Sequence, residues 1–200
     1  MSEKTYMINE WFYSLQGEGV RAGTPNLFLR FSGCNLKCTK EEMGFDCDTE
    51  FSSGRPWTLS QIISNLQEVS SSSEWIILTG GEPSLQVDEE LIDGLHAAGY
   101  KIAIETNGTR ELSSKVDWIC VSPKGAEHTL KQKFAHELKY VRSYGQGIPK
   151  PVIEAQHYLI SPAFEAEGLD RRNLEWCIQL VKENPRWRLS LQLHKFLRIR

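Results

Sequence analysis

The chain has 200 residues, of which 40% are hydrophobic and 24% charged, and its formal net charge at pH 7 is −3. These are ordinary globular values, so they exclude collagen-like, coiled-coil and disordered proteins. This net charge does not indicate a basic surface that would bind nucleic acid. No apolar run has the length of a membrane span or the form of a signal peptide. We therefore expect one cytoplasmic domain over residues 1–200 that binds neither nucleic acid nor membranes.

Apolar patterning predicts strands and helices in alternation along most of the chain. The predicted strands are 6–13, 26–31, 75–78, 101–104, 116–121, 137–141, 156–160 and 187–192. The predicted helices are 59–69 with Thr58 as its cap, a second around 91–95 that stops at Gly99, and 170–183. The stretch 34–57 is predicted to be irregular.

Short apolar strands that alternate with helices indicate parallel βαβ units. About six such units fit after residue 26, whereas a complete eight-unit barrel needs ~250 residues. We therefore predict an α/β fold, either an incomplete parallel βα barrel or an open parallel sheet. Because the carboxyl ends of parallel strands share one edge, the polar residues there should open onto one face. These residues are Cys34, 79–82, 105–107, 122–124 and Ser161.

Three of the five cysteines, Cys34, Cys38 and Cys47, lie within fourteen residues directly after a predicted strand. An odd cysteine count in a cytoplasmic-type sequence argues against a disulfide framework. Structural zinc needs four ligands, and the nearest histidine along the chain, His96, lies on a predicted helix far beyond. Three thiolates without a fourth ligand suit a [4Fe-4S] cluster with one open iron; zinc and unrelated cysteines are the alternatives. The other two cysteines are predicted to be core residues: Cys120 and Cys177.

Seven ordered motifs carry a resemblance that spans nearly the whole chain. They lie at 15–19, 28–34, 47–49, 79–83, 104–108, 121–124 and 187–195. The cysteines and the Gly-Gly-Glu-Pro at 80–83 resemble the radical S-adenosylmethionine (SAM) superfamily. The full set resembles the 7-carboxy-7-deazaguanine synthase family of the queuosine pathway. This resemblance implies an incomplete, roughly six-unit parallel βα barrel of the radical SAM type with an N-terminal strand extension.

The resemblance also implies an activity, cofactors and partners. The implied enzyme is a carbon–nitrogen lyase that converts 6-carboxy-5,6,7,8-tetrahydropterin to 7-carboxy-7-deazaguanine with release of ammonia. The implied cofactors are a [4Fe-4S] cluster, SAM and Mg²⁺. The implied partners are the pterin substrate, a flavodoxin- or ferredoxin-like electron donor and a second copy of the chain in a homodimer.

Site residues follow from the resemblance position by position, with no side-chain catalyst beyond the radical. Cys34, Cys38 and Cys47 would hold the cluster, and the Thr49 hydroxyl would bind Mg²⁺, which prefers oxygen ligands. The implied SAM contacts are Gly80, Gly81, Glu82, Glu105, Asn107, Ser122, Pro123, Lys124 and Ser161. The implied substrate contacts are Leu15, Gln16, Gly17, Glu18, Arg30, Thr79 and Arg200. Among these, the guanidinium of Arg30 suits a carboxylate because it can bind both oxygens at once.

The chain departs from the family pattern at two places. The family has two residues between its second and third cysteines, whereas eight, 39–46, lie there in this chain, so the cluster-binding loop 34–57 holds an insertion before Cys47. Lengthening the loop from two to eight residues costs about 1.2 kcal/mol, against about 10 kcal/mol for metal–thiolate binding. The insertion therefore affects the shape of the loop and not the presence of the cluster. In addition, Ser161-Pro162 stands where the family has Gln-Pro.

Two other functions share part of these motifs. A radical SAM activating enzyme, which installs a glycyl radical in a partner protein, would have the cluster and the Gly-Gly-Glu-Pro loop but not the turn at 16–19 or Arg30. A zinc-stabilised interaction domain would yield a colourless metalloprotein.

Overall fold

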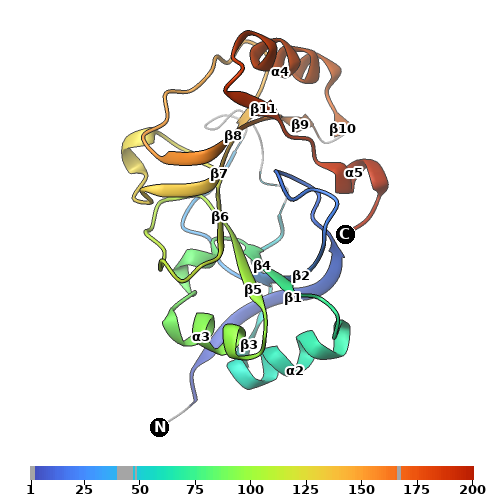
Figure 1. The fold of residues 1–200 in the computed structure, drawn as a ribbon, viewed down its shortest axis with the longest axis vertical. Coiled ribbons are helices and arrows are strands. Elements are labelled where there is room, and N and C mark those ends of the chain that lie inside the picture. The colour runs from blue at the N-terminus through green and yellow to red at the C-terminus, as the bar shows by residue number, and fades with distance from the viewer. Residues whose placement is uncertain (1–2, 40–46, 48, 166–167) are drawn as a thin grey trace.

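The computed structural model describes residues 3–39, 47, 49–165 and 168–200 (Figure 1). Its strands are β1 (Thr5–Leu15), β2 (Pro25–Phe31), β3 (Arg55–Thr58), β4 (Trp75–Gly80), β5 (Lys101–Thr106), β6 (Trp118–Val121), β7 (Phe134–Arg142), β8 (Glu154–Pro162), β9 (Phe164–Glu165), β10 (Gly168–Leu169) and β11 (Trp187–Leu189). Its helices are α2 (Leu59–Val69), α3 (Glu89–Ala97), α4 (Arg171–Glu183) and α5 (Leu193–Leu197), with short 3-10 turns at Pro83–Leu85 and Glu127–Thr129.

One nine-stranded sheet organises the molecule, in the order β11-β8-β7-β6-β5-β4-β2-β1-β3. From β2 to β11 every neighbouring pair is parallel, whereas β1 runs antiparallel to both β2 and β3. In the described part of the chain no ladder joins the two end strands, β3 and β11, so the sheet stays open. The predicted incomplete parallel barrel with an N-terminal strand extension is confirmed.

Alternation along the strands sorts side chains between two faces of the sheet. On β4 and β5, Ile76, Leu78, Ile102 and Ile104 belong to the main core, which α2 and α3 cover with residues such as Leu66. The opposite, inner face carries a smaller apolar cluster of Phe12, Phe28, Ile77 and Ala103. The residues that follow on this inner face, toward the carboxyl ends of the strands, are polar. The sheet therefore has a packed outer face and an inner face that opens into the site.

Local signals place the helix ends where the sequence predicts them. Thr58 caps α2 in a capping box with Gln61: its hydroxyl accepts from the N–H of Gln61, whose side chain accepts from the N–H of Thr58. Asp88 caps α3 by accepting from the N–H of Leu91, and Gly99 follows that helix with φ +92°. No helix of the described residues has the length and apolarity that crossing a bilayer requires.

The strand–helix alternation is less regular than the sequence suggests. The connections from β5 to β6, from β6 to β7 and from β7 to β8 contain no α-helix. Most of β3 lies within the stretch 34–57 that was expected to be irregular. The last strand ends at Leu189 instead of Gln192, because only Trp187–Leu189 pair with β8. The β3 ladder is a long-range feature: it pairs with the start of β1, for example Thr58 with Thr5.

Candidate active site

A cavity of about 430 Å³ lies at the carboxyl ends of the parallel strands. This volume is within the range of pockets that bind small molecules. Most of the sequence-predicted site residues line it: Glu18, Cys34, Cys38, Cys47, Thr49, Thr79, Gly80, Gly81, Glu82, Glu105, Asn107, Ser122, Lys124 and Ser161. The cavity is where the tertiary structure brings these separate motifs together.

Strand register explains why the inner wall of the cavity is polar. Arg30 of β2 lies opposite Thr79 of β4, and Glu105 of β5 lies opposite Cys120 of β6, which in turn lies opposite Glu137 of β7. These residues alternate with core residues of the outer face, so their side chains share the inner face. One row of the sheet thus presents a guanidinium, a hydroxyl, two carboxylates and a thiol.

Gly80 and Gly81 seat the Gly-Gly-Glu-Pro loop directly against the end of β2. Gly80 has φ +116°, and a Cβ there would lie 2.4 Å from the backbone N of Phe31. A Cβ on Gly81 would lie 2.0 Å from the carbonyl oxygen of Gly33. The N–H of Glu82 donates to this same carbonyl at 2.8 Å. Both glycines are therefore required for close backbone packing, Gly80 against Phe31 and Gly81 against Gly33, besides any approach to a ligand.

Glu82 and Asn107 bind to neighbouring loops of the protein. Glu82 is 1% exposed, and its carboxylate accepts from the N–H of Ser84, the hydroxyl of Thr106 and the N–H of Asn107 at 2.6–3.0 Å. The Asn107 amide donates to the side chain of Asn35 at 3.0 Å. These bonds tie the Gly-Gly-Glu-Pro loop and the loop after β5 to the segment that begins at Cys34. The two side chains thus position the loops around the cavity.

The three clustered cysteines all line the cavity, and none of them forms a disulfide. The N–H of Cys47 donates to the carbonyl of Cys38 at 3.3 Å, and the Sγ of Cys34 accepts from the N–H of Leu36 at 3.4 Å. Of the predicted insertion, residues 40–46 lie outside the described residues, as does Asp48. Burial raises the pKa of the Cys34 thiol.

The donor set fits the groups that the sequence predicts. Within the described ranges no three His, Cys, Asp or Glu side chains are grouped closely enough for one metal ion. A four-iron cluster is larger than one ion, and three thiols from one loop around a common space match the ligand set of a cluster with one open iron. The cavity also has room for a small molecule beside these thiols.

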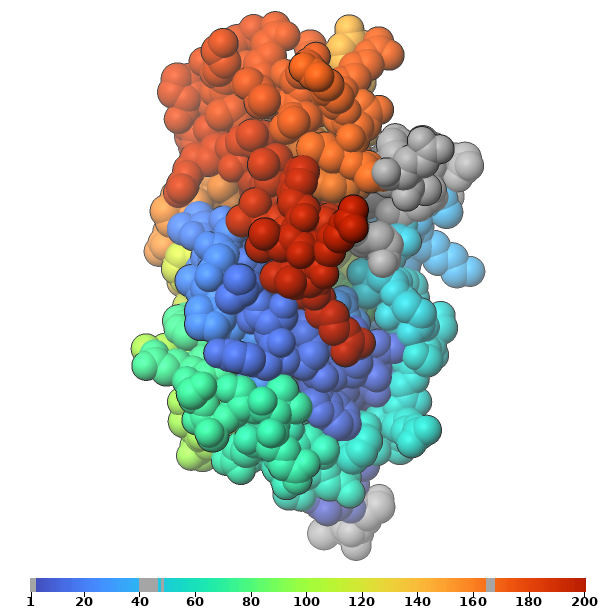
Figure 2. Space-filling view, turned by 90° about the vertical axis from the view of Figure 1, so that its right-hand side faces the viewer, coloured from blue at the N-terminus to red at the C-terminus, as the bar shows by residue number. Residues whose placement is uncertain are grey.

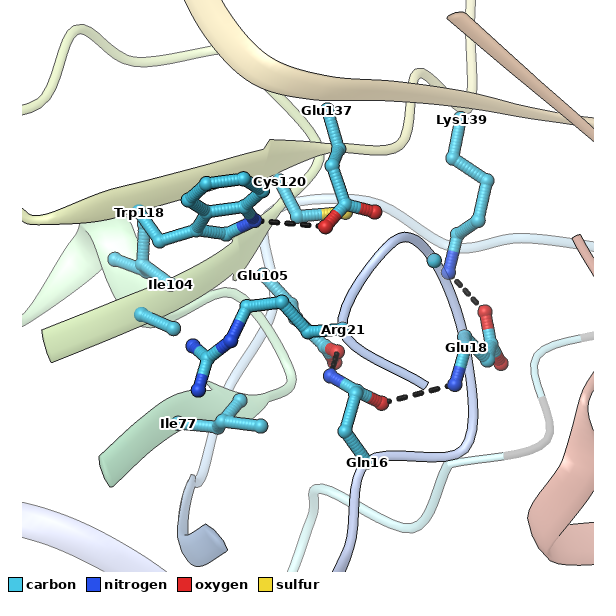
Figure 3. Close-up of a pocket in the computed structure, with 12 residues that line it drawn as sticks. Gln16, Glu18, Arg21, Ile77, Ile104, Glu105, Trp118, Cys120, Glu137 and Lys139 are labelled. Atoms are coloured by element: carbon cyan, nitrogen blue, oxygen red, sulfur yellow. Dashed lines mark hydrogen bonds and ion pairs between the residues drawn. The ribbon is translucent and has the colours of Figure 1, made fainter. Parts of the chain in front are cut away.

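The loop between β1 and β2 forms the floor of the cavity with Glu18 and lines a smaller cleft beneath it, which Figure 3 shows. Its Gln16 side chain donates to Glu105 at 2.9 Å, and Glu105 also accepts from the Thr79 hydroxyl at 2.9 Å. Deeper inside, the carboxylate of Glu137 accepts from the N–H of Val20 at 3.0 Å and from the Trp118 indole at 2.7 Å. The loop therefore crosses the inner face and is bonded to strands on its far side.

A buried ion pair joins this loop to β7. The ammonium of Lys139 donates to one oxygen of Glu18, and the Gln192 amide donates to the other oxygen at 2.7 Å. Burial alone would raise the pKa of Glu18, but the charge of Lys139 and the hydrogen bonds from Lys139 and Gln192 lower it to about 2. Glu18 is therefore an ionised acceptor at the cavity floor. Burial also raises the pKa of Glu137, and there the hydrogen bonds from Val20 and Trp118 and the charge of Lys139 do not reverse the shift.

Arg30 and Arg200 lie beside the cavity and share one partner. The Nε of Arg30 donates to Glu10 at 3.0 Å, and the guanidinium of Arg200 pairs with the other oxygen of Glu10. Both guanidinium groups also lie near the Phe12 ring, with centroid distances of 5.7 Å and 5.2 Å. Figure 2 shows the C-terminal segment lying across the N-terminal strands, and the Ser14 hydroxyl donates to the carbonyl of Arg200 at 2.6 Å.

The remaining predicted residues lie at the margin. Leu15 is exposed, and Gln16 lines a smaller cleft below the floor. Gly17 packs against His194, with 2.1 Å between an added Cβ and the Nδ1 of the ring. Pro123 is buried between Ser122 and Lys124. The structure thus brings these residues near the cavity without placing them in its wall.

Several cavity residues do not emerge from the sequence motifs. They are Leu36, Phe51, Cys120, Lys139, Val141 and Phe164. Cys120 is 8% exposed, as a core residue should be, but it lies on the inner face and forms part of the cavity wall, which corrects its interpretation as a core residue only. Cys177 is fully buried in the core, as predicted. A lysine inside the apolar pattern of β7 was the one signal that could have indicated Lys139.

Comparisons with known proteins agree with this geometry. The model of the 4Fe-4S single cluster domain family matches residues 15–119, more than half of the chain. The chain is 41% identical over 198 residues to the 7-carboxy-7-deazaguanine synthase of Bacteroides thetaiotaomicron, covering 96% of this chain and 98% of that protein. It is 39% identical to the enzyme of the same name from Burkholderia multivorans, covering 98% and 99%. The crystal structure of QueE from Escherichia coli superposes with a TM-score of 0.73 over 95% of each chain, at 24% identity, which supports the fold. On the strength of the near-full-length matches, this chain belongs to the 7-carboxy-7-deazaguanine synthase family.

Proposed function

We propose that this chain converts 6-carboxy-5,6,7,8-tetrahydropterin to 7-carboxy-7-deazaguanine with release of ammonia, and that the cavity at the carboxyl ends of the strands is the site of this reaction. The family membership supports the reaction. The observation that carries the placement is that three thiols, the Gly80–Gly81 loop and the ionised Glu18 all face one cavity. When bound, the cluster and SAM supply radical chemistry that amino-acid side chains do not provide.

We assign the positions of the [4Fe-4S] cluster and of SAM in the cavity from the residues that line it. Cys34, Cys38 and Cys47 hold the [4Fe-4S] cluster. SAM lies along the ends of β4 to β6 and β8, against Gly80, Gly81, Glu82, Glu105, Asn107, Ser122, Pro123, Lys124 and Ser161. Because the side chains of Glu82 and Asn107 are bonded to neighbouring loops, we assign to them the orientation of these loops, in addition to contact with SAM.

The substrate occupies the floor of the cavity and the adjoining ends of β1 and β2. Glu18 accepts from N–H donors of the pterin edge, and Thr79 offers its hydroxyl. Arg30 binds the substrate carboxylate, while Glu10 holds its Nε. Leu15, Gln16, Gly17 and the C-terminal Arg200 complete the set from the same side. This arrangement places acceptors at one end of the pterin and a guanidinium at the other.

Thr49 supplies one oxygen to a Mg²⁺ that also binds the substrate. It lines the cavity two residues after Cys47, so the metal and the cluster would have neighbouring sites. Mg²⁺ keeps several waters and accepts a single neutral protein ligand. The affinity for Mg²⁺ should therefore depend mostly on the substrate oxygens.

Two partners complete the proposal. A flavodoxin- or ferredoxin-like protein supplies the electron, and two copies of the chain form a homodimer. Exposed apolar residues of the C-terminal segment, Phe196, Leu197 and Ile199, are compatible with an interface. Light scattering after size exclusion measures the number of chains directly.

The test is turnover under anaerobic conditions. Protein reconstituted with iron and sulfide is incubated with 6-carboxytetrahydropterin, SAM, a reductant and Mg²⁺, and the product is identified by mass spectrometry. We expect 7-carboxy-7-deazaguanine without any partner protein substrate. Cleavage of SAM without this product would contradict the proposed reaction and would favour an activating enzyme of another radical SAM class.

The same assay tests the roles of SAM and Thr49. Loss of ammonia with ring contraction needs no net oxidation, so SAM should be regenerated and the ratio of 5′-deoxyadenosine to product should lie well below one. Thr49→Ala should weaken the effect of Mg²⁺ on turnover while iron content is unchanged, and Thr49→Ser should largely restore it. A ratio of one at every substrate concentration would show that SAM is consumed.

A further inference from the structure

We propose that Lys139 is a positioning residue of the substrate site, which together with Gln192 orients the Glu18 carboxylate toward the N–H edge of the pterin. This inference rests on the proposed function and deepens it. It assigns the lysine an effect on the substrate that is exerted through Glu18.

The geometry holds the carboxylate from two sides. Lys139 projects from the inner face of β7 and binds one oxygen of Glu18, while Gln192, which follows β11, binds the other at 2.7 Å. The N–H of Glu18 donates to the side chain of Gln16 at 3.1 Å, so the backbone is fixed as well. With each oxygen bonded to a donor from a different segment, the carboxylate cannot rotate freely. Figure 3 shows Lys139 and Glu18 pointing toward one another across the floor.

A gain in folding stability does not by itself explain why the Lys139–Glu18 ion pair is buried. Only 10% of the side-chain surface of Lys139 and 16% of that of Glu18 is exposed, so both charges lose most of their hydration. Burying an ion pair gains little over packing apolar residues of the same volume. The pair lies in the wall of a cavity that can hold a ligand, where an ionised acceptor has a use.

The chemistry of the pterin edge fits an ionised carboxylate. A carboxylate has about four acceptor positions, and Lys139 and Gln192 occupy one on each oxygen, so acceptor capacity remains for the amine and ring N–H of a guanine-like edge. A protonated Glu18 would present its own O–H to these donors. The other ionisable groups that line this cleft or act on Glu18 are Arg21 in the β1–β2 loop, Glu105 on β5, Cys120 on β6, Glu137 on β7 and His194 on α5. Of the two cations that line the cleft, Lys139 is the one bonded to Glu18, whereas the guanidinium of Arg21 donates to Asn26 and lies over the Trp75 ring.

The experiment measures binding of 6-carboxypterin, a fluorescent and unreduced analogue, to the reconstituted full-length protein. We compare the wild type with Lys139→Met, Lys139→Arg, Glu18→Gln and the double variant, and use Lys133→Met, an exposed lysine just before β7, as the matched control. Thermal unfolding is followed for each protein. Lys139→Met should weaken binding by about ten- to a hundredfold, the range of one charge-assisted hydrogen bond. Lys139→Arg should retain most of the affinity, and Lys133→Met all of it.

A second readout separates positioning from a general loss of structure. In Lys139→Met, burial should raise the pKa of Glu18, so affinity should increase as the pH rises from 5 to 8, whereas Lys133→Met should follow the wild type over the same range. Adding Lys139→Met to Glu18→Gln should change affinity by less than about twofold, because both changes remove the same contact. This comparison remains informative if Lys139→Met alone does not fold, since the double variant buries no unpaired charge.

Three results would overturn the inference. The first is wild-type affinity in Lys139→Met. The second is a further tenfold loss when Lys139→Met is added to Glu18→Gln, which would mean that the lysine acts on the ligand directly. The third is a wild type that neither binds nor converts the pterin, and this result would reject the proposed function along with the inference.

Discussion

The backbone N–H of Cys47 donates to the carbonyl oxygen of Cys38 at 3.3 Å, although eight residues separate the two cysteines in the chain. This bond makes them backbone neighbours, as two cysteines with a short spacing would be. Their thiols face the same cavity as that of Cys34. The longer spacing is therefore compatible with the ligand arrangement that the family pattern implies.

Shortening the insertion should accordingly leave the cluster in place. We expect that replacing residues 39–46 by a two-residue spacer preserves the iron content and the visible absorption of the anaerobically reconstituted protein. The shorter loop lowers the entropy cost of closure by about 1.2 kcal/mol. Iron and sulfide analysis checks this outcome, and a protein that folds but binds no iron would show that the inserted residues are needed.

Replacing any one of the three cavity cysteines should abolish the cluster. Cys34→Ala, Cys38→Ala and Cys47→Ala should each lose the brown colour and the roughly four irons per chain that a [4Fe-4S] centre carries. Cys177→Ala is the control, because this thiol is buried in the core and donates to the carbonyl of Arg142.

Cys120→Ala makes the stricter comparison, because Cys120 lines the same cavity as the three cysteines. We expect it to retain its iron. Loss of iron in Cys120→Ala together with retention in Cys38→Ala would contradict the assignment of ligands.

Arg30→Lys should reduce kcat/KM by ten- to a hundredfold while SAM cleavage without product continues. The lysine keeps the charge but loses the planar fork that binds both oxygens of a carboxylate, and a charge-assisted hydrogen bond contributes about 1.5–3 kcal/mol. Steady-state kinetics with the pterin substrate measure the effect. Arg188→Lys, at an exposed position of β11, is the control and should have wild-type kinetics. Unchanged kinetics in Arg30→Lys would mean that the guanidinium does not bind the substrate carboxylate.

Gly81→Ala should disrupt the SAM end of the cavity and the start of the cluster loop together. An added Cβ would lie 2.0 Å from the carbonyl oxygen of Gly33. This oxygen belongs to the backbone, so it cannot move aside without displacing the loop. We expect at least a tenfold loss of SAM affinity, measured by equilibrium dialysis, and lower iron content. Gly147→Ala is the control, because its Cβ would meet no atom within 4 Å. Wild-type SAM binding by Gly81→Ala would show that the loop tolerates displacement.

Asp88, the N-cap of α3, should make the free energy of unfolding depend partly on pH. Burial alone would raise the pKa of Asp88, but hydrogen bonds from Lys4, the N–H of Leu91 and Tyr6 outweigh it and lower the pKa. A carboxyl with a lowered pKa stabilises the fold above its unfolded value and loses this contribution as the pH falls through the folded one. Asp88→Asn, which can still cap the helix, should therefore cost about 0.2–1 kcal/mol at pH 7 and less at pH 2, because the carboxyl becomes protonated as the pH falls through its folded pKa. Urea unfolding at both pH values checks this, and an equal cost at both would contradict it.

Short-range patterns were enough to predict much of the fold. Strand residues alternate between core and inner face with a period of two, and helix signals such as the Thr58 cap and the stop at Gly99 act within a few residues. The sequence motifs also indicated most of the cavity wall, because parallel strands bring their carboxyl ends to one edge whatever their exact order. The sequence did not predict that the connections between β5 and β8 contain no α-helix. Long-range pairing stabilises these strands without helices between them.

The contacts within the site were decided by the tertiary structure. Lys139 and Glu18 are 121 residues apart, and only the strand register together with the path of the β1–β2 loop across the inner face brings them together. In the same way, Glu10 joins Arg30 to Arg200 from opposite ends of the chain. A sequence motif determines which chemical groups are available and on which side of a strand they lie. Which group neutralises which charge depends on distances across the sheet, and these are set by the packing of the whole chain.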